Sequence, residues 1–111
     1  MQSKFQKLII DIKVSDLTRA VGFYKDTLGL PLIRRTGDWA SFEVAGAEIH
    51  LFLNGGATEG VEFRVKNIEA VFQALKAGGV VFKTSAIEQF SWGKIAKFQD
   101  SEGNTLALVE D

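Results

Sequence analysis

Cysteine is absent from this 111-residue chain, and histidine occurs only once, as His50. Without cysteine there are no disulfides, thiolate metal ligands or thiol nucleophiles, which is compatible with a reducing compartment. No apolar run approaches the ~20 residues that a membrane span requires, and residues 1–7 lack the apolar core of a signal peptide. We therefore expect a cytoplasmic protein with no membrane association.

An excess of either charge sign is also lacking. Thirteen basic and fourteen acidic residues give a formal net charge of -1, and no Lys/Arg cluster is dense enough to follow a phosphate backbone. Nucleic acid is therefore not an expected partner. Hydrophobic residues make up 46% of the chain and include nine Phe, which is enough for one core at this length. We expect a single domain spanning residues 1–111.

The first half of the chain predicts one strand, one helix and three further strands. Residues 7–14 alternate between apolar and polar types, as in a strand with one buried face. Ser15 or Asp16 offers an N-cap, and apolar residues at helical spacing predict a helix that ends at Gly29. Turn residues then separate three short alternating runs, at 32–35, 39–44 and 48–54.

The same order of elements recurs after a linker-like stretch at residues 55–58. A strand is predicted at 60–65 and a helix at 67–76, followed by glycines that stop it. Matching residues 51 positions apart pairs Asp16 with Asn67, Leu17 with Ile68, Val21 with Phe72 and Tyr24 with Leu75. This self-similarity indicates two tandem modules, residues 1–56 and 57–111. The predicted fold class is α+β, with the helices on the outer face of a concave mixed sheet.

Strand alternation assigns a mixed aromatic and charged set of residues to the sheet face opposite the helices. Such a face is expected to form a pocket for a small molecule. Its members include Asp11, Lys13, Trp39, Ser41, Glu43, Glu48, His50 and Phe52 in the first half, and Gly60, Glu62, Arg64, Ile95, Lys97, Ala107 and Val109 in the second.

Two strings carry a resemblance to a known family. They are VSDLTRAVGFYKDTLGL from Val14 to Leu30 and FQDSEGN from Phe98 to Asn104. Together they resemble the glyoxalase, bleomycin-resistance protein and extradiol dioxygenase superfamily, also called vicinal oxygen chelate, although Ser101 stands where the family usually has proline. The resemblance implies two βαβββ modules that form a continuous concave sheet, commonly in a homodimer. It leaves open whether the modules pair within one chain or are exchanged between chains.

The resemblance also implies where a divalent metal would bind in the enzymes of this family. The four ligand positions correspond to Ile9, His50, Gly60 and Ala107 in this sequence. Three of them have no side-chain donor, and apolar residues cannot replace the nitrogen and carboxylate ligands that such a metal requires. We therefore expect no cofactor at the usual site. One alternative is a displaced metal site made of Asp11, His50 and Glu62.

The favoured hypothesis is a metal-independent protein that binds a small organic molecule, in the manner of antibiotic-resistance proteins of the bleomycin-resistance type. The ligand is expected to be mostly apolar or aromatic, and a cationic one is slightly favoured because Glu43 and Glu48 have no repeat-related basic partner. The ten-residue stretch 84–93 is interpreted as an irregular loop that could close over the site. The expected ligand-binding residues are Trp39, Phe52 and Trp92 for stacking, His50 for orientation, and Asp11, Glu62 and Lys97 at the polar end.

Two alternatives to this hypothesis stay open. The chain could be a lyase, isomerase or dioxygenase-like enzyme in which His50 is the catalytic residue, with or without the displaced metal. The charges on the open face could instead neutralise one another. If the first strands of the two modules lie side by side and antiparallel, Asp11 would face Arg64, and Lys13 would face Glu62.

Overall fold

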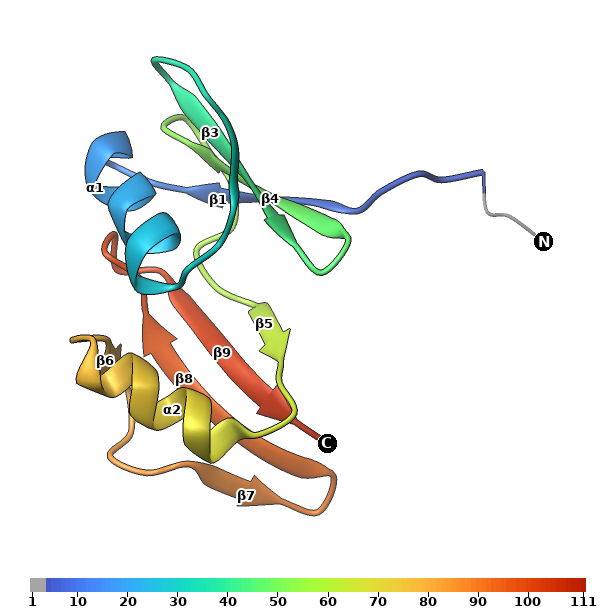
Figure 1. Ribbon diagram of the computed structural model, residues 1–111, viewed down its shortest axis with the longest axis vertical. Coiled ribbons are helices and arrows are strands. Elements are labelled where there is room, and N and C mark those ends of the chain that lie inside the picture. The colour runs from blue at the N-terminus through green and yellow to red at the C-terminus, as the bar shows by residue number, and fades with distance from the viewer. Residues whose placement is uncertain (1–3) are drawn as a thin grey trace. The chain divides into compact units, whose positions relative to one another are not determined.

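The computed structural model describes residues 4–111 and divides the chain into two compact units, Met1–Ala57 and Thr58–Asp111. Each unit combines helix with a mixed sheet, which confirms the predicted α+β class (Figure 1). The first unit consists of β1 (Ile9–Lys13), α1 (Leu17–Gly22), the π-helix η1 (Phe23–Thr27), β2 (Leu32–Arg35), β3 (Trp39–Val44) and β4 (Ala47–Phe52). The second consists of β5 (Val61–Arg64), α2 (Ile68–Ala77), β6 (Val81–Phe82), β7 (Glu88–Phe90), β8 (Gly93–Gln99) and β9 (Thr105–Glu110).

The two sheets share one pattern of strand pairing. The first sheet has the order β1-β4-β3-β2, and the second has the order β5-β9-β8-β6, with β7 also paired to β8. In each sheet the unit's first strand runs parallel to its last strand, while the other pairs are antiparallel. A parallel neighbour needs a crossover connection, and the helix of each unit lies in that connection.

The helix of the first unit begins as the sequence predicts. Asp16 is its N-cap, because the carboxylate accepts a hydrogen bond of 3.0 Å from the Arg19 backbone N–H. The predicted helix continues through η1 rather than as α-helix alone, and Gly29 then takes a positive φ of 74°. Along α1 the buried residues recur at helical spacing, and this helix contacts β3 and β4.

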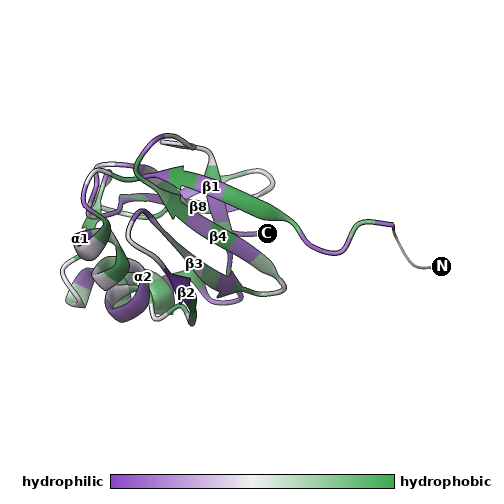
Figure 2. Cartoon of the chain, turned by 90° about the horizontal axis from the view of Figure 1, so that it is seen from above, coloured by the Kyte–Doolittle hydropathy of each residue, from purple (hydrophilic) through white to green (hydrophobic). Residues whose placement is uncertain are grey.

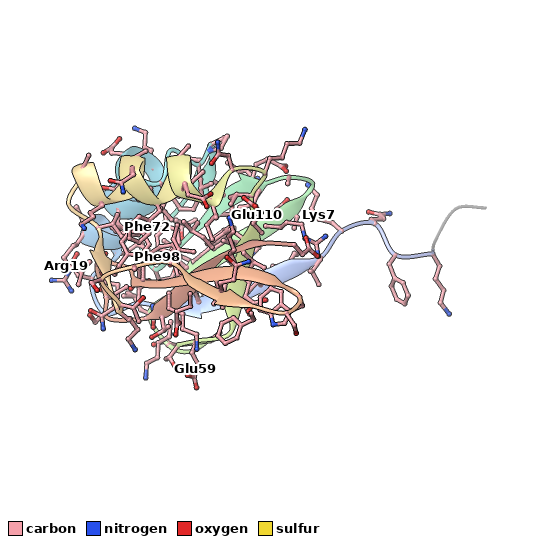
Figure 3. All side chains as sticks on the ribbon, turned by 90° about the horizontal axis from the view of Figure 1, so that it is seen from below. Lys7, Arg19, Glu59, Phe72, Phe98 and Glu110 are labelled. Carbon is pink, nitrogen blue, oxygen red and sulfur yellow. The ribbon has the colours of Figure 1, made fainter. Side chains whose placement is uncertain are left out.

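The second unit places an aromatic core under α2. Asn67 caps this helix by accepting a hydrogen bond of 3.1 Å from the Ala70 backbone N–H. The rings of Phe72 and Phe82 lie 4.4 Å apart, and those of Phe82 and Phe98 lie 5.6 Å apart. Figure 3 shows Phe72 and Phe98 between the helix and the strands below it. Phe98 is fully buried, as is its repeat equivalent Phe42 in the first unit.

The open faces of the sheets carry the alternating residues expected from the sequence. Hydrophobic and hydrophilic residues alternate along β4 (Figure 2). In this strand Ile49 and Leu51 are buried, whereas Glu48, His50 and Phe52 on the other face are partly exposed. The side-chain alternation of a strand therefore separates core from candidate site within six residues.

The prediction of an irregular stretch over residues 84–93 is wrong at Gly93, the first residue of β8, and for residues 88–90. These residues form β7, which is held antiparallel against β8 with Glu88 opposite Ile95 and Phe90 opposite Gly93. A three-residue strand is too short to show a periodic pattern, and its pairing depends on β8 rather than on its own sequence. The second unit consequently has one strand more than the predicted module, and the proposed loop is shorter.

The glycine-rich linker is tied to the first strand. Lys13 N–H donates to the Ala57 carbonyl at 3.0 Å, and Ala57 N–H donates to the Asp11 carbonyl at 2.7 Å. Gly56 lies so close to β1 that a Cβ atom there would come within 2.8 Å of the Ile12 carbonyl carbon. Among residues 4–111 there is no helix long and apolar enough to cross a membrane.

Candidate functional site

Three rings gather on the open face of the first sheet and form what we term the aromatic cluster, Trp39, His50 and Phe52. Trp39 on β3 is in register with Phe52 on β4, and their rings stack 5.9 Å apart with an interplanar angle of 20°. The His50 ring lies 5.2 Å from that of Trp39 and 6.1 Å from that of Phe52. The structure thus brings together three of the residues that the sequence predicts for the site.

The imidazole of His50 is held by a carboxylate that the sequence analysis did not pair with it. Nε2 of His50 lies 2.8 Å from Oε1 of Glu48, which precedes it by two residues on the same strand face. An ionised carboxylate only accepts hydrogen bonds, so Nε2 carries the proton, and in the neutral ring Nδ1 is the acceptor. The i, i+2 spacing of Glu48 and His50 was the available sequence signal.

Lys7 completes a charged network around Glu48. Its Nζ lies 3.1 Å from Oε2 of Glu48 and 3.7 Å from Oε1 of Glu43. Hydrogen bonds from His50 and Lys7 hold the pKa of the Glu48 carboxyl below its usual range, and the bond to Glu48 raises the pKa of Lys7. Both glutamates thus have a basic partner in Lys7, which the repeat does not provide, and this removes the reason for favouring a cationic ligand.

Asp11 lies beside the aromatic cluster on the neighbouring strand. It is exposed and in register with His50, while Lys13 is in register with Phe52. Arg64, in the second unit, forms an ion pair with Asp111, with Nε and Oδ1 3.2 Å apart. The predicted pairings of Asp11 with Arg64 and of Lys13 with Glu62 would join the two units, and they stay predictions.

A pocket of about 330 Å³ opens on the second sheet. Glu62 on β5 and Lys97 on β8 both line it, and Ala107 on β9 lies between them, in register with each. Two more predicted site residues therefore share one pocket within the second unit. The remaining lining residues are Glu59, Gly60, Val61, Thr105 and Leu106.

Trp92 lies apart from the aromatic cluster, in the second unit. It lies in the turn between β7 and β8, where its ring stacks on that of Phe90 at 5.9 Å with an interplanar angle of 2°. Both side chains remain about half exposed, at 52% for Trp92 and 46% for Phe90. A hairpin turn therefore presents this residue to solvent, and a role in ligand stacking stays a prediction.

Part of the open face of the second sheet is more buried than expected. Ile95, Ala107 and Val109 are each less than a tenth exposed and form one apolar cluster. The sequence placed them on the ligand face because strand alternation gives the face of a residue but not its accessibility. Ser41 of the first unit, also assigned to that face, is buried as well.

The four positions that would hold the superfamily metal do not fit one. Ile9, Gly60 and Ala107 have no side-chain donor atom, so His50 is the one position of the four with a ligand nitrogen, and one imidazole does not fix a divalent metal. Over the described residues no group of three His, Cys, Asp or Glu side chains is placed to hold a metal ion. Asp11 and His50 belong to the first unit and Glu62 to the second, so the displaced site built from all three stays a prediction.

The sequence of this chain matches one family. A family model described as the Glyoxalase/Bleomycin resistance protein/Dioxygenase superfamily matches residues 8–108. The chain belongs to this superfamily, which confirms the resemblance seen in the two sequence strings.

Individual relatives extend the match over nearly the whole chain. YraH of Bacillus subtilis (strain 168) is 25% identical, with 93% of this chain and 96% of that protein covered. TnmS3, an antibiotic binding protein from Streptomyces sp. CB03234, has a TM-score of 0.78 at 23% identity, covering 99% and 98% of the two chains. Lactoylglutathione lyase from Agrobacterium tumefaciens has a TM-score of 0.80 at 16% identity, covering 93% and 91%. At these identities the solved structures share the fold.

Proposed function

We propose that this protein binds a small organic molecule without the help of a metal ion. The observation that carries the proposal is the set of residues at the four metal positions. Ile9, Gly60 and Ala107 supply no ligand atom, and the one nitrogen-bearing side chain, His50, is hydrogen bonded to Glu48 at 2.8 Å. A single imidazole does not fix a divalent metal.

The aromatic cluster supports a binding role. Rigid rings offer a large contact area while losing little conformational entropy when a ligand binds. Trp39 and Phe52 are partly exposed on the open face, and the polar Nδ1 of His50 lies within the same cluster. This combination of apolar surface with one oriented polar group is typical of small-molecule sites. The fold likeness to the antibiotic binding protein TnmS3 is in keeping with this role.

Metal analysis of the purified protein, combined with a binding screen, tests the proposal. After dialysis, Zn, Ni, Mn and Fe should be far below one equivalent per chain, and His50→Ala should not change the metal content. In the same preparation, aromatic compounds should shift the NMR signals of Trp39 and Phe52. Stoichiometric metal that disappears in His50→Ala, or an aromatic panel without any binder, would contradict the proposal.

The second candidate function is an enzyme in which His50 acts as a general base. The observation that favours it is the bond from Nε2 to Glu48, because a carboxylate that orients an imidazole in this way recurs in general acid–base sites. The fold likeness to a lactoylglutathione lyase belongs to the same hypothesis. Turnover of a bound compound that is lost in both His50→Ala and Glu48→Gln would support the enzyme, whereas binding without turnover supports the first proposal.

A further inference from the structure

The pocket of the second unit has opposite charges on its two sides. Glu62, Ala107 and Lys97 form one row across three adjacent strands, because Ala107 is in register with both of the others. Register partners project from the same face of a sheet. With neighbouring strands ~4.8 Å apart, the Cα atoms of Glu62 and Lys97 are separated by roughly 10 Å.

The centre of the row is small and apolar. Ala107 offers only a methyl group, and Gly60, which also lines the pocket, has no side chain. The two residues stand at positions where the superfamily enzymes place metal ligands, and a Cβ atom added at Gly60 would meet nothing within 4 Å. The pocket volume of about 330 Å³ lies at the lower end of the range for small-molecule sites, about 300–1,000 Å³.

Neither charged side chain of the row is neutralised within the part of the chain that the structure describes. Glu62 and Lys97 form no ion pair or side-chain hydrogen bond with each other or with another residue from 4 to 111. The nearby Lys83 is engaged differently, because its Nζ donates to Oγ1 of Thr105 at 3.1 Å. Glu59, on the pocket rim, extends away from the chain (Figure 3).

From this row we propose that the pocket binds the zwitterionic part of an amino acid or short peptide. A ligand carboxylate pairs with the Lys97 ammonium, and a ligand ammonium pairs with the Glu62 carboxylate. An α-amino acid separates its two charges by ~3 Å, and a hydrogen bond of about 2.8 Å at each end gives a span of roughly 9 Å. The flexible Glu62 and Lys97 side chains rise from one sheet face at Cα atoms roughly 10 Å apart and can bracket a ligand of this size. The proposal rests on the proposed binding function and names its ligand class.

A singly charged ligand satisfies the row less well. An anion pairs with Lys97 but is repelled by the Glu62 carboxylate. A cation pairs with Glu62 but is repelled by the Lys97 ammonium. A zwitterion pairs with both side chains and brings no net charge into the pocket. Charge-assisted hydrogen bonds of this kind are among the stronger polar contacts, and an unmet partner costs affinity.

Matched ligand sets test the proposal on isotope-labelled protein by NMR titration. The common amino acids and a set of dipeptides are compared with their C-terminal amides, which keep only the positive charge, and their N-acetyl forms, which keep only the negative charge. At least one zwitterion should shift the signals of Glu62, Lys97 and Ala107 and bind about tenfold or more tightly than both of its derivatives. No zwitterion binding at the row, or equal binding of a singly charged form, would overturn the proposal.

Charge-removing variants assign the two ends. Glu62→Gln should abolish the preference for a zwitterion over its N-acetyl form, and Lys97→Met should abolish the preference over its amide. Glu88→Gln, on the exposed strand β7 and outside the pocket lining, is the matched control and should keep both preferences. If Glu62→Gln keeps the preference for a zwitterion over its N-acetyl form, or Glu88→Gln loses it, the assigned row is wrong.

The outcome also separates this proposal from the proposed function. Aromatic compounds that shift Trp39 and Phe52 while every zwitterion fails would overturn the zwitterion pocket and leave metal-independent binding standing. If neither the aromatic compounds nor the zwitterions bind, both the zwitterion pocket and the proposed binding function are overturned.

Discussion

His50 donates from Nε2 to Oε1 of Glu48 across 2.8 Å, and the two residues stand on one face of β4. This bond fixes the tautomer and orientation of the only imidazole in the chain. It leaves Nδ1 of the neutral ring as the acceptor beside the Trp39 and Phe52 rings. Because Ile9, Gly60 and Ala107 offer no side-chain donor at the other three family positions, we assign this imidazole to hydrogen bonding with a ligand.

The Glu48 network makes stability depend on pH at the acid end. Hydrogen bonds from His50 and Lys7 lower the pKa of the Glu48 carboxyl below 4.5, so its contribution is present above that pH and is lost as the pH falls through the lowered pKa. The wild type should unfold at a higher temperature than Glu48→Gln at neutral pH, and the difference should close in acid. Thermal unfolding followed by circular dichroism at several pH values measures this, with Glu59→Gln as the control. A difference that stays constant down to strongly acidic pH would exclude the ionised network as its source.

Substitutions in the aromatic cluster should weaken binding of an aromatic ligand through two different routes. His50→Ala removes one polar contact and is expected to cost about 1–2 kcal/mol if it bonds a neutral ligand. Phe52→Ala removes contact area and a stacking partner of Trp39. Isothermal titration with a compound from the aromatic panel measures both, and Phe5→Ala, whose ring is 75% exposed outside the cluster, is the control. Unchanged affinity in both cluster variants would mean that the ligand binds elsewhere.

Much of the fold could be predicted because its signals are local. Asp16 and Asn67 cap their helices in the structure as their sequence positions indicate, and alternation along β3 and β4 gives the correct faces. The short strand β7 could not be predicted, since three residues carry no period and its partner lies on the other side of a turn.

The sequence predicted which residues of the candidate site share a sheet face, but not which charged side chains contact one another. Trp39, His50 and Phe52 share their face through strand alternation, and their convergence follows from the register of β3 and β4. The bonds among charged side chains were not predictable in the same way. Lys7 reaches Glu48 from the segment before β1, and this depends on the parallel pairing of β1 with β4 rather than on any repeat.

The stability of the turn before β9 should depend on the buried carboxylate of Asp100. Oδ1 of Asp100 accepts hydrogen bonds from the backbone N–H groups of Glu102 and Asn104, and Oδ2 accepts one from the Asn104 side chain. Asp100→Ala leaves these donors unmet in a buried site and should lower the free energy of unfolding by about 2–4 kcal/mol. Urea denaturation measures this loss. Ser101→Ala in the same turn should change stability by much less, and equal losses would contradict the role of the carboxylate.

We expect a homodimer in solution, because the edge strand β2 exposes apolar side chains. Leu32 is 37% and Ile33 is 50% exposed at this edge of the first sheet, and exposed apolar edges favour pairing with another chain. Sedimentation velocity at micromolar concentration should show a dimer, and Ile33→Lys should shift it towards monomer. Lys25→Glu on η1 is the control for a change in charge. A wild type that sediments only as a monomer would contradict the expectation.

Gly56 should be far less tolerant of a side chain than its neighbour Gly55. Its φ of +136° is unfavourable for other residues, and an added Cβ would lie within 2.9 Å of backbone atoms of Asp11, Ile12 and Lys13. Because the backbone of β1 cannot move aside without straining its pairing with β4, Gly56→Ala should destabilise the fold by about 1–3 kcal/mol or more. Gly55→Ala adds its methyl group to open space and should have little effect. Urea denaturation of both variants measures the difference, and equal stability would mean that the linker does not press against β1 in solution.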